Sequence, residues 1–292
     1  MKTVKNVCTL IPGVTVLIIR YAEIGLKSPS VRTMFENRLK DNILSMLMRD
    51  GVEALVYKGE ARFYAEASDT GRAVRSLRKV FGIASVSIAE QCMSDMADMC
   101  SLAERYAFSR LPDGSSFAVR ARREGTHTYT SMDAGREVGS AIYESNKDRG
   151  ITVDLTSPDV IFFLEIRNNR AYIFSEYVRC HGGLPLGTQG RVVADVFDDR
   201  GLLSAWLMMR RGCKVLVRGD YGGGILGEYD PNLKEYTESQ SKDVLGLVSG
   251  SDLGSFSSMD FTGDVPLYFP TIGMSDENVQ ETLCALRAEL YG

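Results

Sequence analysis

The sequence is poor in the residues from which metal sites and disulfide frameworks are built. It has no Cys-x-x-Cys pair and only two histidines, His127 and His181. Its six cysteines follow no regular spacing: Cys8, Cys92, Cys100, Cys180, Cys213 and Cys284. Neither a zinc knuckle nor a disulfide scaffold is therefore indicated, and no histidine-based metal site is expected.

Long apolar runs are also missing. No stretch approaches the ~20 apolar residues of a membrane span, and the start Met-Lys-Thr-Val-Lys-Asn lacks the apolar core of a signal peptide. We therefore expect a cytoplasmic protein without a membrane segment. The composition, 44% hydrophobic and 25% charged over 292 residues, is ordinary for a globular protein with material for more than one core.

Charge is unevenly distributed along the chain. The total is −4, but residues 1–190 carry a net charge of +3 and residues 191–292 carry −7. The negative total argues against nonspecific nucleic-acid binding by the whole surface. Any RNA site is expected in the N-terminal part.

One stretch there is a candidate for such a site. Apolar Phe117, Val119 and Ala121 alternate with Arg120 and Arg122, so a strand would hold both arginines on one face. A helix is expected from residue 133 to residue 149, with an N-cap at position 131 or 133. From this pattern alone, a solvated sheet face is the more frequent explanation of alternating arginines.

The rest of the chain divides into segments with different periodicities. Residues 14–89 predict a β-α-β-β-α-β order, the ferredoxin-like pattern. A helix (93–110) precedes the arginine strand, and two further strands (160–166 and 171–176) flank an Asn-Asn turn. From residue 191 onward strands and helices alternate, which predicts a parallel, doubly wound sheet.

Residues 179–190 include five glycines and prolines, and we place a domain boundary there. The predicted domains are 1–90, 91–180 and 181–292. The fold class is multidomain, α/β and α+β.

The ordered motifs of this sequence resemble those of a known family. The run 117–123, then 129–132, 136–139, 153–155 and 158–160, resembles a THUMP domain, specifically that of the tRNA 4-thiouridine synthases, which are tRNA sulfurtransferases. Segments 20–27, 182–190, 205–212, 248–254 and 272–274 are similar to other parts of the same family. The resemblance implies a tRNA ligand, a homodimer, the use of ATP and Mg²⁺, a sulfur-carrier partner and a link to thiamine thiazole synthesis.

The resemblance also suggests which residues contact RNA. A basic face would recognise the shape and backbone of the tRNA acceptor end rather than its base sequence. The candidates are Arg120, Arg122, Arg123, Tyr129, Thr130 and Arg136, with Lys27 and Arg38.

The nucleotide loop departs from the family pattern. In the family it reads Ser-Gly-Gly-x-Asp-Ser, whose small residues let backbone N–H groups surround the phosphates of ATP. The matching positions here are Val196, Phe197, Asp198, Asp199, Arg200 and Gly201. Both glycines are replaced, and two adjacent carboxylates stand where phosphate would bind. No cysteine lies in residues 220–242, where the family carries its sulfur-transfer cysteine, and Cys213 is expected to be a buried thiol.

Three functions therefore compete. The leading hypothesis is a tRNA-binding protein with a degenerate nucleotide domain, no catalytic residues and no cofactor. The alternative is an active sulfurtransferase in which Asp198 and Asp199 hold Mg²⁺ beneath the phosphates of ATP. The third is a structural protein whose RNA face is vestigial, and it predicts no tRNA affinity at moderate salt.

Overall fold

The computed structural model describes residues 15–220, 223–238, 243–256 and 265–291, so Cys8 lies outside the described residues. The chain divides into two compact units. Of the described residues, unit 1 contains 15–18, 64–67 and 87–178, and unit 2 contains 19–63, 68–86 and those between 179 and 291. Among the helices in the described ranges, none is long and apolar enough to cross a membrane.

The first part of the chain has the predicted β-α-β-β-α-β order. Its elements are β1 (Thr15–Arg20), the 3₁₀ helix η1 (Glu23–Leu26), α1 (Pro29–Arg49), β2 (Ala54–Gly59), β3 (Arg62–Ala67), α2 (Thr70–Arg78) and β4 (Ser85–Met93).

Local chemistry explains these elements. Helix α1 buries Phe35, Leu39, Ile43 and Leu47, which are spaced four residues apart and form one apolar face. Helix α2 begins after Asp69, whose carboxylate accepts a hydrogen bond from the backbone N–H of Arg72 at 2.9 Å.

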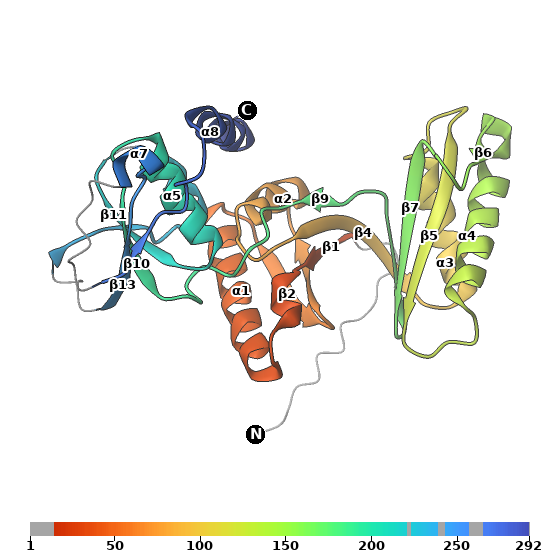
Figure 1. The fold of residues 1–292 in the computed structure, drawn as a ribbon. Coiled ribbons are helices and arrows are strands. Elements are labelled where there is room, and N and C mark those ends of the chain that lie inside the picture. Colours follow the sequence, from red (N-terminus) through yellow and green to blue (C-terminus); the bar gives the residue numbers. More distant parts are fainter. Residues whose placement is uncertain (1–14, 221–222, 239–242, 257–264, 292) are drawn as a thin grey trace, which may run out of the picture. The chain divides into compact units, whose positions relative to one another are not determined.

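The middle part forms a helix-covered sheet. Its elements are α3 (Met96–Phe108), β5 (Ser116–Glu124), α4 (Ser131–Asn146), η2 (Lys147–Arg149), β6 (Thr152–Val153), β7 (Val160–Arg167), β8 (Arg170–Phe174) and β9 (Val178–Arg179). The strand order is β4-β8-β7-β5-β6, with β5 parallel and β8 antiparallel to β7. Figure 1 shows α3 and α4 together beside β7 and β5, and the core beneath them includes Phe117, Val138 and Phe162.

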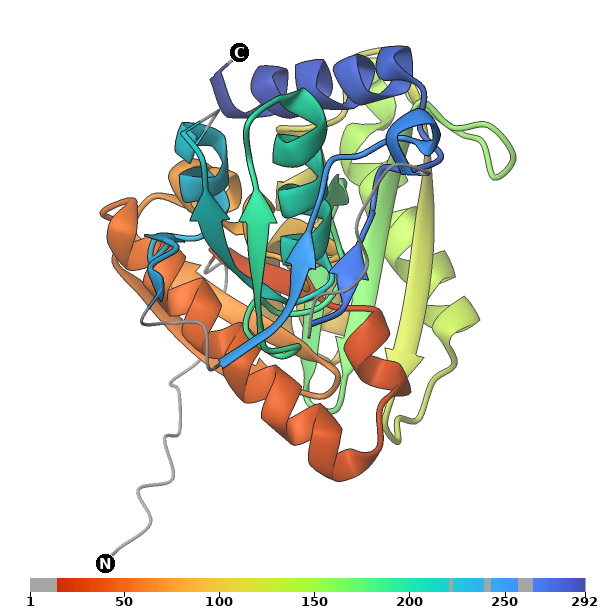
Figure 2. The same ribbon diagram turned by 60° about the vertical axis from the view of Figure 1, so that its left-hand side comes forward.

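The C-terminal part is a parallel five-stranded sheet, as the alternation of strands and helices predicts. Its elements are β10 (Arg191–Asp195), α5 (Asp199–Arg210), β11 (Lys214–Arg218), α6 (Gly223–Tyr229), β12 (Lys234–Glu235), β13 (Val244–Val248), α7 (Leu253–Phe256), β14 (Leu267–Tyr268) and α8 (Asp276–Tyr291). Across the sheet the strands lie in the order β12-β11-β10-β13-β14, so the chain adds strands on one side of β10 first and on its other side afterwards. Figure 2 shows the arrows of this sheet, green to blue, pointing the same way.

One local prediction differs from the structure. Helix α4 is capped by Thr130 rather than by Ser131 or Asp133, because the Thr130 hydroxyl accepts from the Asp133 N–H while the Asp133 carboxylate accepts from the Thr130 N–H. The segment after β9 is irregular, as predicted, and its four residues from Gly183 to Leu186 are buried.

Candidate nucleic-acid interface

A groove in unit 1 lies beside β5 and α4. Its volume is about 830 Å³, and its lining combines apolar side chains with three arginines. Gly135 of the helix faces Ala121 of the strand: a Cβ on Gly135 would lie 3.5 Å from the Ala121 Cβ, at ordinary contact distance. The residues around the groove include Val119, Arg120, Arg122, Met132, Arg136, Tyr143, Leu155 and Phe163.

Alternation along β5 places the arginines as predicted. Val119 and Ala121 are half-buried and pack against the core under α3 and α4, whereas Arg120 and Arg122 are exposed. All four residues line the groove. One guanidinium nitrogen of Arg120 donates to the Leu155 carbonyl at 2.5 Å. This bond fixes a positive charge at the rim of the groove.

Arg136 and Arg123 have different positions. Arg136 lines the groove from α4 with 67% of its side chain exposed, 3.3 Å from the Asp133 carboxylate. Arg123 is exposed outside the groove lining and donates to the Gly125 carbonyl at 3.0 Å.

Two other candidates have structural roles in unit 1. The Tyr129 hydroxyl donates to the Ser94 carbonyl, and burial raises the pKa of this phenol. Thr130 is the cap of α4. Neither lines the groove.

Lys27 and Arg38 belong to unit 2. Both are exposed, and the Lys27 ammonium lies 5.9 Å from the centre of the Phe35 ring. Lys27 precedes α1, and Arg38 lies within this helix.

The apolar lining of the groove was not predicted from the sequence. Met132, Leu155 and Tyr143 are 79%, 64% and 39% exposed, and Phe163 lies in β7. The available signal was that Met132 and Tyr143 fall off the apolar face of α4, which is made by Ala134, Val138 and Ile142. Exposed apolar side chains beside arginines suit a ligand that has both flat bases and phosphates.

The loop between β10 and α5 is the second candidate site. Asp198 is the N-cap of α5, and its carboxylate accepts from the Gly201 N–H at 2.7 Å. Phe197 is 63% exposed, and Val196 is fully buried. A carboxylate of the chain itself therefore occupies the end of the helix that would otherwise attract a phosphate.

Neighbouring side chains of this loop bind the C-terminal helix. The Asp199 carboxylate accepts from Arg287 at 3.0 Å and from Gln280 at 2.5 Å. Arg200 donates to Asp276 at 2.9 Å and to two backbone carbonyls. Asp198 and Asp199 thus have separate partners, on α5 and α8.

The crevice at this loop has an acidic lining. It measures about 410 Å³ and is lined by three aspartates, one arginine and three serines, with Phe197 and Gly250. Backbone N–H donation from Ser255 lowers the pKa of Asp252, so this carboxylate stays charged. These residues do not fit a triphosphate. Within the described ranges, no group of three or more His, Cys, Asp and Glu side chains could hold a metal ion.

Two described cysteines of unit 2, Cys213 and Cys180, do not favour thiolate chemistry. Cys213 is buried, as predicted, and burial raises its pKa. Burial also raises the pKa of Cys180 to about 12. A raised pKa leaves a thiol protonated and poorly nucleophilic.

Comparison with family models defines the class of this protein. Residues 16–87 match the ThiI ferredoxin-like domain, and residues 93–176 match the THUMP domain. The chain is a THUMP-domain protein whose THUMP domain follows a ThiI ferredoxin-like domain.

The curated relatives give the family. A probable tRNA sulfurtransferase of Methanosarcina acetivorans is 40% identical over 206 residues, covering 68% of this chain and 49% of the relative. One of Methanobrevibacter smithii is 36% identical over 210 residues, covering 69% and 52%. The chain spans about half the length of these relatives. Through its two N-terminal domains it belongs to the ThiI-type tRNA sulfurtransferase family.

Solved structures share the fold over nearly the whole chain. PH1313 from Pyrococcus horikoshii aligns with a TM-score of 0.79 and 26% identity, covering 93% of this chain and 99% of that one. A 4-thiouridine synthetase in complex with RNA and ATP aligns with a TM-score of 0.77 and 20% identity, covering 96% and 87%. The C-terminal sheet is therefore included in the shared fold.

Proposed function

We propose that this protein binds tRNA through the groove beside β5 and α4 and does not itself adenylate the RNA. The observation that carries the binding proposal is the combination of Arg120, Arg122 and Arg136 with exposed apolar side chains in one groove. Arginines neutralise phosphates, and apolar or aromatic side chains accept unstacked bases. The tRNA sulfurtransferase relatives identify tRNA as the RNA class to test.

The arginine pair provides the direct test. Replacing Arg120 and Arg122 together by alanine is expected to weaken tRNA binding and to reduce the slope of log K against log salt by about 0.7–0.9 for each phosphate that is no longer neutralised. Filter binding or fluorescence anisotropy at several salt concentrations measures both quantities.

A charge-matched control removes Arg105 and Lys234, two exposed cations outside the groove lining. It should retain most of the affinity. Equal weakening in both double variants would mean that only net charge matters, and unchanged binding in the Arg120/Arg122 variant would remove the groove from the site.

The proposal that adenylation is lost rests on the Asp198 carboxylate at the start of α5. We expect no heat from Mg-ATP titrated into the wild-type protein in calorimetry. In Asp198→Ser, which keeps a capping side chain without the charge, appearance of ATP binding would identify the carboxylate as the obstacle. Micromolar binding by the wild type, about −8 kcal/mol, would contradict the proposal.

The alternative is an active sulfurtransferase that makes 4-thiouridine with ATP, Mg²⁺ and a sulfur-carrier partner. The names of the relatives favour it, as does the ATP-bound neighbour of the same fold. Formation of 4-thiouridine in tRNA by the purified protein with a sulfide source would establish this function. A homodimer is an expectation from the resemblance, and a cytoplasmic location is an expectation from the sequence.

A further inference from the structure

The segment between β9 and β10 ties two parts of unit 2 together. On one side, Cys180 N–H donates to the Ala84 carbonyl at 3.0 Å, and Gly182 exchanges backbone hydrogen bonds of 2.8 Å with Gly82 and Ile83. On the other side, Leu184 N–H donates to the Arg210 carbonyl at 3.0 Å. We call residues 180–190 the strap. It is bonded both to the segment that follows α2 and to the end of α5.

Apolar packing joins the same two parts. Phe81, which follows α2, is 1% exposed and belongs to the core of the C-terminal sheet. Its ring centre lies 5.5 Å from that of Trp206 and 5.2 Å from that of Tyr229. Burial of this ring removes apolar surface from water, so the packing favours contact between the two parts.

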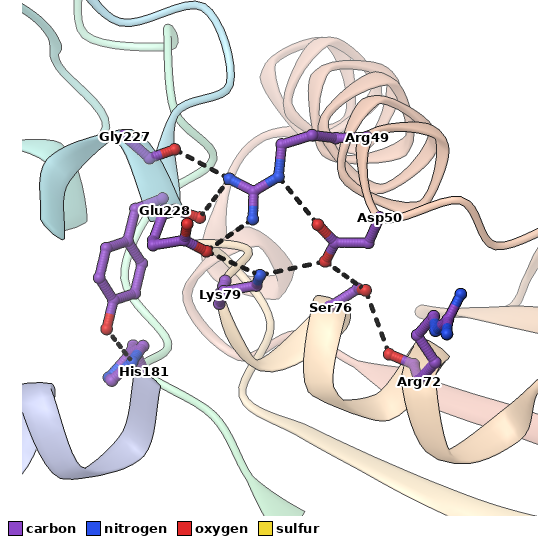
Figure 3. A network of polar contacts seen from close by, with 9 residues as sticks. Arg49, Asp50, Arg72, Ser76, Lys79, His181, Gly227 and Glu228 are labelled. Carbon is purple, nitrogen blue, oxygen red and sulfur yellow. Dashed lines mark hydrogen bonds and ion pairs between the residues drawn. The ribbon is translucent and has the colours of Figure 1, made fainter. Parts of the chain in front are cut away.

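A polar network lies beside this packing (Figure 3). Arg49 at the end of α1 is 2.7 Å from the Glu228 carboxylate and donates to the Gly227 carbonyl at 2.9 Å. Lys79 lies 3.0 Å from both Glu228 and Asp50. Burial opposes ionisation of Glu228, but hydrogen bonds from Lys79 and Arg49 lower its pKa overall.

We propose that the C-terminal domain of this protein acts as a brace that stabilises α1 and α2 of the ferredoxin-like domain, independently of any nucleotide chemistry. The strap, Phe81 and the Glu228 network all cross between these helices and the C-terminal sheet. Two of the candidate RNA-binding residues, Lys27 and Arg38, lie just before α1 and within it. A contribution of the brace to tRNA affinity therefore rests on the proposed function. A chain that no longer adenylates would still need this domain.

Two adjacent glycines of the strap provide a matched test. Both have a positive φ, +65° at Gly182 and +76° at Gly183. A Cβ on Gly182 would meet no atom within 4 Å, whereas one on Gly183 would lie 2.1 Å from the Arg210 carbonyl oxygen. Gly183→Ala must therefore displace the strap from α5, whereas Gly182→Ala adds only the backbone strain of a positive φ.

Hydrogen exchange of the full chain measures the consequence. With Gly183→Ala, amides of α1 and α2 should exchange about tenfold faster, although neither helix contains the substitution. Gly182→Ala should change them by no more than about threefold. Acceleration confined to the strap, α5 and β11 would overturn the brace.

A milder variant covers the case in which Gly183→Ala does not fold. Glu228→Gln removes the negative charge that Arg49 and Lys79 share, and Glu281→Gln removes the charge of an exposed glutamate of α8 as the control. Faster exchange in α1 and α2 with Glu228→Gln alone supports the brace; equal exchange in both variants overturns it.

Binding of tRNA is measured on the same variants, well below their unfolding temperatures. A fall of about threefold or more in affinity with Gly183→Ala supports a role of the brace in recognition. A wild-type chain that binds no tRNA would overturn the proposed function instead, and the exchange result would still decide the brace.

Discussion

Single side chains decide what each site can bind. In the groove, Arg120 and Arg122 point away from the core because they alternate with Val119 and Ala121 along β5. In the loop after β10, the Asp198 carboxylate accepts a hydrogen bond from the Gly201 N–H in the first turn of α5. The first arrangement attracts phosphate, and the second repels it.

The aromatic residue of the groove should contribute separately from its charges. We expect Tyr143→Ala to weaken tRNA binding by about 5- to 150-fold if its ring stacks on one unpaired base, since such stacking is worth about 1–3 kcal/mol. Because no charge is removed, the salt dependence should stay that of the wild type. Anisotropy titrations at two salt concentrations separate these effects.

Tyr143→Phe is the control for the phenol group, because it keeps the ring. Its affinity should stay close to that of the wild type. Normal binding by Tyr143→Ala would show that bases do not reach this side chain.

Elements were predicted from the sequence more accurately than their contacts. The alternation of residues 117–123 and the four-residue spacing in α1 identify a strand and a helix, since each pattern belongs to one secondary structure. The cap of α4 was placed one to three residues too late, because Thr130, Ser131 and Asp133 are all good capping residues and only geometry selects among them.

The cap of α4 supports the groove indirectly. Thr130→Ala should lower the free energy of unfolding by about 0.5–2 kcal/mol, because the capping box with Asp133 is removed. Hydrogen exchange at the start of α4 localises the effect, and Thr130→Ser should preserve the wild-type exchange. Wild-type exchange in Thr130→Ala together with weaker tRNA binding would instead indicate that Thr130 contacts the RNA itself.

At the scale of the whole molecule, the sequence shows which residues are buried but not what covers them. Phe81 follows α2, and no periodicity in the sequence indicates that it packs on the C-terminal sheet. The apolar lining of the groove was not predicted for the same reason: Met132 and Leu155 are far apart in the sequence, and only the fold brings them together.

The stability of unit 2 should depend on pH through His181, which lies in the strap. Its ring lies 5.1 Å from Trp206, and its Nε2 is 3.4 Å from Glu289. Burial lowers its pKa, with Arg210 and Arg78 adding to this effect and Glu289 opposing it. The unfolded chain therefore binds a proton at higher pH than the folded chain does.

Stability should consequently fall as the pH drops below about 6.5, the ordinary pKa of histidine. Urea unfolding followed by the fluorescence of the single tryptophan, Trp206, measures this at about pH 7.5 and 5.5. His181→Gln should flatten the pH dependence in this range, and His127→Gln should not. The same slope in His181→Gln as in the wild type would exclude His181 as its cause.

The short strand β6 has one further consequence. It pairs with β5 only at Ser116 and Phe117, and among the described residues no strand continues this pairing toward Glu124. An open strand edge is a template for self-association, and charged side chains are the usual protection. Arg120 and Arg122 would thus keep β5 apart from β5 of a second molecule while attracting RNA. Removing them for a binding assay should also make the protein more prone to aggregation, and light scattering of that variant would show it.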